Sequence, residues 1–326
     1  MGIPLRILLA SALVFSVAAA ADDHPASSSS RPIALAELWE DTSLTHALPH
    51  CFRIYRRIPL DSGLTQQLRL YVVNPRTWKP SDRRPAVVFI HGGGWSQGDP
   101  DQWFPQCRYF ALRGAVGVSV QYRLATGTNT PASCLSDCEA AIAYLRRYAH
   151  ELGVDPKRIA VVGESAGGHL AAALGTVSVE AGRSESVPDA LVLLNPITDL
   201  TTTWGQCWGN SAQKFSPLQH ICKGSPPTLL IHGQADSVVD IFHARAFHQR
   251  MLELRNQCRL IEVPGADHAF AVFGFGPPDG NILAIFEIDR YLCHLGYLAG
   301  AQLPLIPTRA QDESGGRKAL DLSLDR

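Results

Sequence analysis

Two glycine-rich segments, each following an apolar run, constrain this chain more than any other feature. Residues 91–95 read HGGGW and follow the apolar run at 86–90. Residues 163–168 read GESAGG, follow the apolar run at 159–162 and lead into a helix-forming stretch. A strand, a sharp Gly-x-Ser-x-Gly turn and a helix together expose a serine at the end of a strand. The flanking glycines matter because a Cβ beside this strained turn would clash.

The chain is long enough for one large α/β domain. The chain has 326 residues, of which 46% are hydrophobic and 18% charged, and its formal net charge is -1. This length is sufficient for a single domain with a sizeable core. No cluster of Lys and Arg stands out, and phosphate binding needs a concentrated basic face. We therefore do not expect nucleic acid as a partner.

The first twenty residues are typical of a cleavable export signal. Arg6 supplies a positive start, residues 7–20 form an apolar run, and the alanines at 18–21 offer a cleavage site before Asp22. The run is shorter than the roughly 20 apolar residues that a membrane span needs. We therefore expect a secreted or periplasmic protein without a stable membrane anchor.

Eight cysteines in an exported chain permit disulfides, although spacing does not determine their connectivity. Cys207 and Cys222 flank a loop-like segment and are the favoured pair. Cys138 shares a helical stripe with Ile142 and Leu145, so a buried thiol is an equal alternative there. Because no cysteine has metal-site spacing with histidine, we expect no metal, and the sequence indicates no cofactor.

From residue 51 onwards, predicted strands alternate with predicted helices. The strands are expected at 68–73, 86–90, 116–120, 159–162, 190–194, 228–231 and 259–263, and the helices at 135–152, 169–174, 242–254 and 282–295. Continuous apolar strands between amphipathic helices predict an α/β fold with a mostly parallel sheet and helices on both faces. We expect a signal peptide at 1–20, a flexible lead-in at 21–50, one catalytic domain at 51–301 and a disordered tail at 302–326.

Ser165, in the middle of the second motif, is the predicted nucleophile. Side chains just past the carboxyl ends of parallel strands converge on one crevice, where the serine needs a base and an orienting acid. His268 follows the last predicted strand and Asp236 follows the strand before it, in the order expected of a hydrolase on such a sheet. His268 would take the serine proton and later protonate the leaving alcohol, while Asp236 would fix the imidazole tautomer.

Three other side chains compete for these roles. His91 and His232 are alternative bases, but each precedes a glycine at a strand end, which favours a role in bracing the turn through hydrogen bonds. Asp199 follows the strand at 190–194 and is an alternative acid. The position of Asp236 after the next strand fits the expected order better.

The tetrahedral intermediate of acyl transfer also needs N–H donors for its oxyanion. The backbone N–H of Ala166, directly after the serine, is one candidate. Gly93 and Gly94 supply the others, because bare backbone approaches a substrate closely. Losing one such donor typically costs about 3 kcal/mol of transition-state stabilisation. A hairpin turn is the structural alternative, and it explains two glycines better than three in a row.

The motifs together resemble the hormone-sensitive-lipase-like branch of the α/β-hydrolases, over residues 68 to 268. QYRL at 121–124, GGHLA at 167–171 and PPTLLIHG at 226–233 add to the likeness. Within the branch, the chain is most similar to secreted esterases of the bifunctional feruloyl and acetyl-xylan esterase type. The resemblance implies an α/β-hydrolase fold, a triad of Ser165, Asp236 and His268, and an oxyanion hole lined by Gly93, Gly94 and Ala166.

The resemblance has one departure. Many members of the wider branch carry an N-terminal helical cap, which the weakly patterned residues 21–50 do not predict. Any lid must come mainly from residues 196–225, and a small lid leaves an open cleft that suits an ester on a bulky polymer. Trp95, Trp204 and Trp208 are candidates for stacking on sugar rings or an aromatic acyl group, with ordinary packing an equal alternative for each.

The leading hypothesis is a secreted serine carboxylesterase that removes acetyl or feruloyl groups from plant polysaccharide through an acyl-enzyme on Ser165. The polysaccharide is inferred from the resemblance alone. A prolyl-oligopeptidase-like peptidase uses the same triad, but no period of about 20–50 residues indicates its propeller. A formamidase acting on a soluble metabolite is disfavoured by export. A non-catalytic binding module on the same scaffold predicts a missing triad member, and none is missing.

Overall fold

The computed structural model describes residues 32–40 and 52–306. The predicted export signal, Cys51 and the chain beyond residue 306 lie outside this part, so the predictions made for them stay untested. Within the described ranges, no helix combines the length and apolar character needed to cross a membrane. The same residues contain no group of three or more His, Cys, Asp or Glu side chains placed to hold a metal ion.

Eight strands form one sheet in the order β2-β3-β5-β4-β6-β7-β8-β9. Their bounds are β2 Phe52–Pro59, β3 Thr65–Val73, β4 Arg84–Ile90, β5 Val116–Val120, β6 Val154–Glu164, β7 Ala190–Leu194, β8 Thr228–Gly233 and β9 Cys258–Val263. All neighbouring pairs from β5 across to β9 are parallel, whereas β2 pairs with β3, and β3 with β5, in antiparallel fashion. The predicted mostly parallel sheet is confirmed, and β2 is a further strand that was not predicted.

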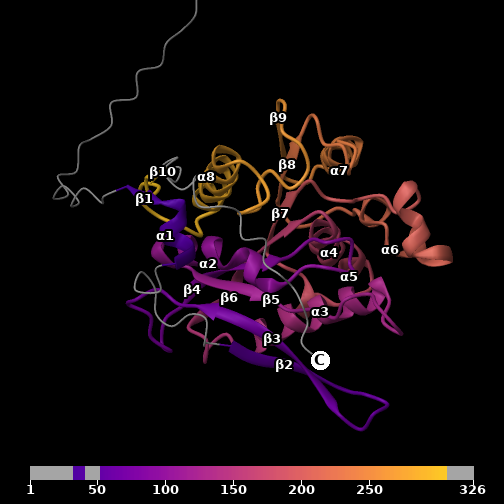
Figure 1. The fold of residues 1–326 in the computed structure, drawn as a ribbon, viewed down its shortest axis with the longest axis horizontal. Helices are drawn as coiled ribbons and strands as arrows, with labels where there is room; N and C mark the ends of the chain where they lie inside the picture. Colours follow the sequence, from indigo (N-terminus) through magenta and orange to yellow (C-terminus); the bar gives the residue numbers. More distant parts are fainter. Residues whose placement is uncertain (1–31, 41–51, 307–326) are drawn as a thin grey trace, which may run out of the picture. The chain divides into compact units, whose positions relative to one another are not determined.

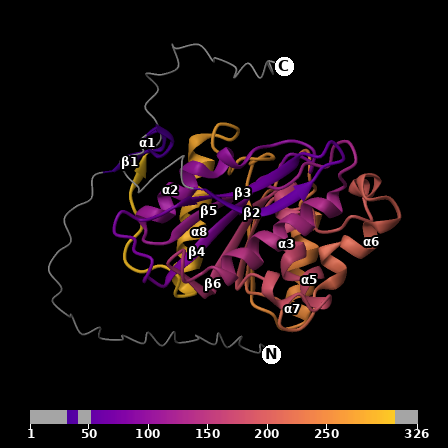
Figure 2. The same cartoon turned by 90° about the horizontal axis from the view of Figure 1, so that it is seen from below.

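Helices cover both faces of this sheet (Figure 1). Their bounds are α1 Leu35–Glu40, α2 Phe104–Leu112, α3 Pro131–Arg147, α4 Ala166–Gly175, α5 Val177–Glu180, α6 Ala212–Phe215, α7 Phe242–Glu253 and α8 Pro278–His294. Helices α2 and α8 lie on one face, and α3, α4 and α7 on the other (Figure 2). The four predicted helices correspond to α3, α4, α7 and α8. Helix α2 was missed because it is buried on almost every side and lacks an amphipathic stripe.

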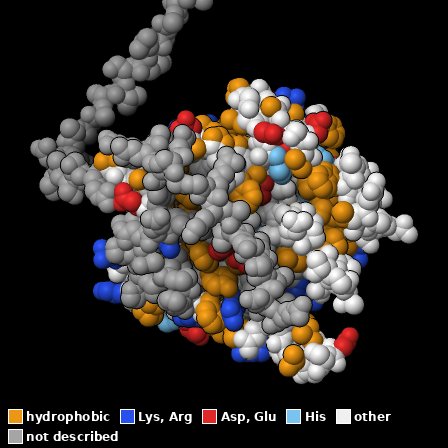
Figure 3. All heavy atoms as spheres, in the orientation of Figure 1, with side chains coloured by type: hydrophobic (Ala, Val, Ile, Leu, Met, Phe, Trp, Pro, Cys, Tyr) orange, Lys and Arg blue, Asp and Glu red, His pale blue; other side chains and the backbone are white. Residues whose placement is uncertain are grey.

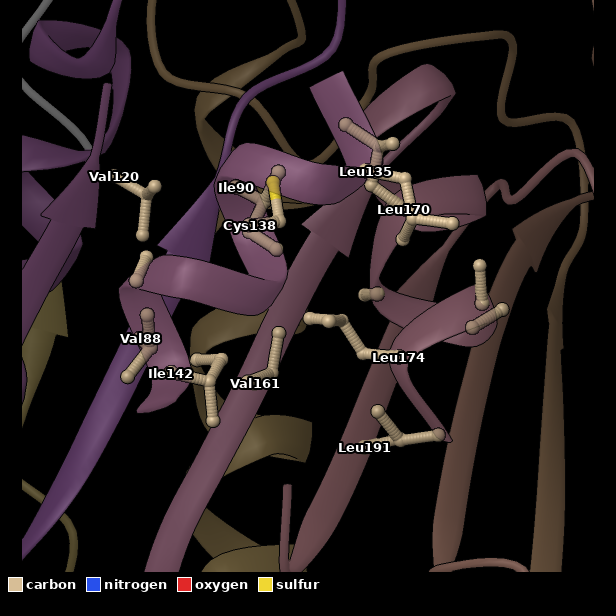
Figure 4. Close-up of a cluster of buried hydrophobic side chains, with 14 of the residues drawn as sticks. Val88, Ile90, Val120, Leu135, Cys138, Ile142, Val161, Leu170, Leu174 and Leu191 are labelled. Atoms are coloured by element: carbon tan, nitrogen blue, oxygen red, sulfur yellow. The ribbon is translucent and has the colours of Figure 1, made fainter. Parts of the chain in front are cut away.

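Each face of the sheet carries its own apolar core. Figure 4 shows the core under α3 and α4, where sheet and helix side chains point toward one another: Val88, Ile90, Val120, Val161 and Leu191 from the strands, and Leu135, Cys138, Ile142, Leu170 and Leu174 from the helices. Cys138 is fully buried here as a free thiol, beside Ile142 and Leu145 on the predicted stripe. The buried-thiol alternative for Cys138 is therefore confirmed.

The favoured disulfide between Cys207 and Cys222 is not formed. Both cysteines are free, with Cys207 exposed and Cys222 half-buried. Cys207 ends a 3₁₀ helix that begins at Thr203, and the sulfur of Cys222 lies 3.8 Å from the hydroxyl of Ser225. The prediction failed because sequence spacing fixes a loop length but not the Cβ geometry that a disulfide requires.

Parts of the predicted lead-in and tail are regular structure. Strand β1, Ile33–Ala34, pairs in parallel with β10, Leu305–Ile306. In α1, Leu35 and Leu38 are buried in the core that α2 and α8 share, and Arg108 of α2 donates a hydrogen bond to the carbonyl of Leu38. The expectations of a flexible lead-in and a disordered tail were therefore wrong for residues 32–40 and 302–306, whose few apolar side chains are enough to fix them to the domain.

The packing of α1 predicts that Leu38→Ala lowers the free energy of unfolding by about 2–5 kcal/mol, since it removes a fully buried side chain. Leu64→Ala is the matched control: Leu64 is 69% exposed in the turn between β2 and β3, and we expect a change within about 0.5 kcal/mol. Urea denaturation followed by circular dichroism measures both. Equal stability of the two variants would contradict the docking of α1.

Candidate active site

Ser165 sits on a strained turn between β6 and α4. Its backbone has φ 53° and ψ -119°, a conformation that residues other than glycine rarely adopt. A Cβ at Gly163 would collide with the carbonyl of Gly167, and a Cβ at Gly167 would collide with the carbonyl of Ile90. The two glycines of the motif are therefore required by the close approach of three backbone segments. Their spacing places the serine hydroxyl just past the carboxyl end of β6.

The three residues of the predicted triad lie within hydrogen-bond distance of one another. His268 Nε2 is 3.0 Å from Ser165 Oγ. On the other side of the ring, His268 Nδ1 is 2.8 Å from Asp236 Oδ2. His268 comes from the loop after β9 and Asp236 from the loop after β8. These side chains are far apart in the sequence, and the parallel strands bring them to one edge of the sheet as predicted.

The carboxyl group of Asp236 is completely buried and fully hydrogen-bonded. Its Oδ1 accepts the backbone N–H groups of Val238 and Val239 at 2.9 and 2.8 Å, and its Oδ2 lies 3.2 Å from His232 Nε2. Burial alone would raise the pKa of Asp236, but the hydrogen bonds from His232, His268 and the two backbone amides lower it below its ordinary value. Asp236 is therefore ionised, and it orients the imidazole of His268 with Nδ1–H toward it.

The competing residues take other positions. His91 is buried, stacks on the ring of Tyr122 at 4.2 Å and is hydrogen-bonded to the carbonyl of Gly92, and burial lowers its pKa to about 4. His232 is buried, and its Nε2 lies 3.2 Å from Asp236 Oδ2. Asp199, near the start of the lid segment at residues 196–225, accepts hydrogen bonds from Thr201 and from the hydroxyl of Ser216. The geometry thus gives both histidines the bracing position that was expected of them.

The glycine-rich loop presents its backbone to the site. The carbonyl of Gly93 accepts the N–H of Gln97 at 2.9 Å, so it points into the turn. Because the groups of a trans peptide point in opposite directions, the N–H of Gly94 is directed away from that turn. Gly93 and Gly94 have φ values of +99° and +57°, and both line the pocket. Ala166 opens α4, where backbone N–H groups lack a partner within the helix.

A pocket of about 340 Å³ opens over these groups. Ser165 and His268 form part of its lining, and much of the remainder is apolar, including Trp204, Val238 and Phe275. Val238 is 50% exposed and Phe275 70% exposed, so the mouth of the pocket is open to solvent. In the space-filling view, hydrophobic side chains gather at the surface near the position of β8 (Figure 3).

A second pocket of about 410 Å³ adjoins the first, because Trp204 and Val238 line both. Its lining is richer in polar groups, with the hydroxyls of Thr202, Thr203 and Ser237. Asp240 contributes a carboxylate to the same pocket. The pocket that contains Ser165 therefore has a neighbouring pocket that is lined by hydroxyl groups.

Of the three tryptophans predicted to contact substrate, only Trp204 lines the pocket around Ser165. Trp95 is fully buried and Trp208 nearly so, and neither lines the pocket around Ser165. The indole N–H of Trp95 donates to His169 Nδ1 at 3.2 Å, and its ring packs edge-on against Trp208 with 5.7 Å between centroids. The prediction was wrong for Trp95 and Trp208 because these rings join the lid segment to α4 instead of facing the cleft.

Glu164 is a site residue that sequence reasoning missed. It lies inside the Gly-x-Ser-x-Gly motif and lines the pocket, yet its side chain is almost completely buried. Its Oε1 accepts a hydrogen bond from Asn195 Nδ2 at 2.8 Å and lies 3.6 Å from His268 Nε2. The available signal was an acidic residue that directly continues an apolar strand.

Comparisons with known proteins agree with this geometry. Residues 87–213 match a family model described as alpha/beta hydrolase fold. The esterase LipC of Mycobacterium tuberculosis is 30% identical over 241 residues, which are 64% of this chain and 59% of LipC, so the chain spans less than two thirds of that relative. The ethyl acetate hydrolase of Pseudomonas putida is 30% identical over 260 residues, which cover 71% of this chain and 80% of that enzyme.

The solved structures include a strongly similar esterase. Esterase 2 of Thermogutta terrifontis is 36% identical, with a TM-score of 0.70 over 77% of this chain and 96% of that one. That esterase has also been solved with butyrate and with propionate bound, and in a form phosphorylated by paraoxon.

Proposed function

The chain belongs to the hormone-sensitive-lipase-like branch of the α/β-hydrolase family, a branch of carboxylic ester hydrolases, and on this premise we propose that it hydrolyses small esters through an acyl-enzyme on Ser165. The observation that carries the proposal is the unbroken line of hydrogen bonds from Ser165 through His268 to the buried Asp236. Nucleophile, base and orienting acid are the three parts that this chemistry needs.

In the first half of the reaction, Ser165 Oγ attacks the carbonyl carbon of the ester while its proton passes to His268 Nε2. The oxyanion of the tetrahedral intermediate accepts hydrogen bonds from the backbone N–H groups of Gly93, Gly94 and Ala166. The bond to the alcohol oxygen then breaks, and His268 returns the proton to that oxygen. In the second half, water attacks the acyl-enzyme with His268 as base, and the carboxylic acid leaves as the proton returns to Ser165.

The size of the reactive pocket supports a short acyl group. A volume of about 340 Å³ with an apolar wall accommodates a few carbon atoms beside the serine. The similar esterase of Thermogutta terrifontis has been solved with propionate and with butyrate bound. Small acyl groups from acetyl to butyryl are therefore the proposed acyl range.

Paraoxon tests the nucleophile directly. We expect one diethylphosphoryl group per chain on Ser165, located by peptide mass spectrometry, together with complete loss of hydrolysis of p-nitrophenyl acetate. Ser165→Ala should stay unlabelled and lose about 10⁶-fold in kcat. Ser62→Ala, in the exposed turn between β2 and β3, is the matched control and should behave as the unsubstituted protein. A label on another residue, or an active Ser165→Ala variant, would refute the assignment.

We further propose that the alcohol part of the substrate is a sugar of a plant polysaccharide that carries acetyl groups. His268 must reach the leaving oxygen, so the alcohol part of the ester lies near this residue. Val238, on the loop that carries Asp236, lines both the pocket that contains His268 and the second pocket. The hydroxyls of Thr203 and Ser237 in that pocket suit the hydroxyls of a sugar, and Trp204 offers a face for stacking. The open mouth of the cleft supports a bulky substrate.

This finer proposal predicts release of acetate from acetylated xylo-oligosaccharides. Thr203→Val should lower kcat/KM for these oligosaccharides by about fivefold, the effect of one hydrogen bond, and leave p-nitrophenyl acetate unaffected. Thr128→Val, at an exposed loop position, is the control. If p-nitrophenyl acetate is hydrolysed but no acetate leaves an oligosaccharide, the polysaccharide proposal fails and the esterase proposal stands.

We also propose that the chain is exported, since residues 1–20 have the pattern of a cleavable signal. Mass spectrometry of the protein from the periplasm or the medium should find a mature chain that begins near Ala21. A full-length chain confined to the cytosol would exclude this.

A further inference from the structure

The triad leaves one acidic side chain of the site unexplained. Glu164 is the last residue of β6, directly before the reactive serine, and it is only 5% exposed. Burying a carboxyl group is unfavourable unless it is hydrogen-bonded or paired with a positive charge. The amide of Asn195 supplies one hydrogen bond, at 2.8 Å to Oε1. Asn195 is itself buried, with a φ of +36°, so the fold holds a strained residue at the place where its amide meets Glu164.

The position of Glu164 relative to His268 suggests a role. Its Oε1 lies 3.6 Å from His268 Nε2, the same nitrogen that faces Ser165 Oγ at 3.0 Å. Asp236 contacts the opposite nitrogen at 2.8 Å. The imidazole therefore lies between two carboxyl groups, and a proton transferred from Ser165 arrives at the nitrogen beside Glu164.

We propose that Glu164 is a second acidic partner of His268, which stabilises the imidazolium from its Nε2 side while Asn195 keeps the carboxylate out of direct contact with that nitrogen. Glu164 thus acts as a positioning residue through its charge. The inference rests on the esterase function proposed above.

The hydrogen bond from Asn195 to Glu164 keeps the proton on His268 available to the leaving alcohol. A carboxylate that accepted the Nε2–H of the imidazolium directly would hold the proton that the leaving alcohol needs. With Oε1 engaged by Asn195, the attraction acts through space over 3.6 Å and leaves Nε2–H free to face Ser165 and the substrate. Attraction at this distance is substantial inside a protein, where water screens charges less than at the surface.

The other charged groups around the ring set the sign of the effect. Asp236 faces His268 from the loop after β8, and Asp267 is its neighbour in the loop after β9. Burial raises the pKa of the hydroxyl of Tyr122, after β5, and the nearby carboxylate of Glu164 raises it further. Burial lowers the pKa of His268, but Asp236, Glu164 and Asp267 outweigh it, so the pKa is raised above 6.5.

The test is the pH dependence of kcat/KM for p-nitrophenyl acetate. Activity requires neutral His268 and therefore rises with pH through its pKa. Glu164→Gln keeps an oxygen acceptor for Asn195 but removes the charge, so the acid limb should move to lower pH by about one unit. The plateau of kcat/KM should fall by up to about tenfold, because the imidazolium loses a partner.

Three further variants separate charge from structure. Glu253→Gln makes the same change on the exposed surface of α7 and should leave the profile in place. Glu164→Asp keeps the charge, so its acid limb should stay closer to that of the unsubstituted enzyme than that of Glu164→Gln. Glu164→Ala removes both the charge and the acceptor for Asn195. A normal profile for Glu164→Gln with activity lost only in Glu164→Ala would make the role purely structural and overturn the proposal.

A second measurement does not depend on turnover. In a Ser165→Ala background, NMR titration of His268 should give a lower pKa for Glu164→Gln than for the single variant. An equal pKa in the two proteins also overturns the proposal. Failure of the unsubstituted enzyme to hydrolyse any ester would instead remove the proposed function.

Discussion

The strained turn at Ser165 depends on backbone segments that approach one another more closely than any side chain allows. Gly163 and Gly167 let β6, the start of α4 and the end of β4 come together, and the backbone N–H of Ser165 is held by the carbonyl of Leu194 on β7. Strands buried on both faces keep these segments in place, so the positive φ of the serine persists although it is unfavourable. The short distance from Ser165 to His268 follows from this arrangement.

A rigid turn brings Ser165 to the site, but the reactivity of this serine depends on how buried charges are arranged around the imidazole of His268. Asp236 stays ionised although buried, because four hydrogen-bond donors converge on it. Glu164 has fewer donors, and burial raises its pKa while Asn195 and His268 oppose that rise. The ionised form of Asp236 is therefore stabilised more strongly than that of Glu164. Asp236 orients the ring, and in our proposal Glu164 stabilises the imidazolium that forms when the ring is protonated.

Sequence reasoning succeeded where one physical signal acts alone. The bounds of β5 and β7 agree with the predicted strands because these are unbroken apolar runs that become buried on both faces. Strand β2 escaped notice because three arginines interrupt its apolar residues and a register irregularity breaks the alternation, as suits an edge strand. The positions of Trp95 and Trp208 were beyond reach, because burial there depends on a lid segment whose own short helices carry no periodic pattern.

That lid segment also explains why the cleft can be small and open at once. His169 of α4 accepts the indole N–H of Trp95 through Nδ1 and donates through Nε2 to the carbonyl of Phe215, at 2.9 Å. Burial lowers the pKa of His169 to about 4, so the neutral ring keeps one donor and one acceptor at neutral pH. Because Trp208 packs on this ring with 4.9 Å between centroids, the lid is fixed to α4 from inside. The wall formed by Trp204 is thus in place before a substrate arrives, and the exposed side chains of Val238 and Phe275 at the mouth remain the parts of the cleft free to adapt to it.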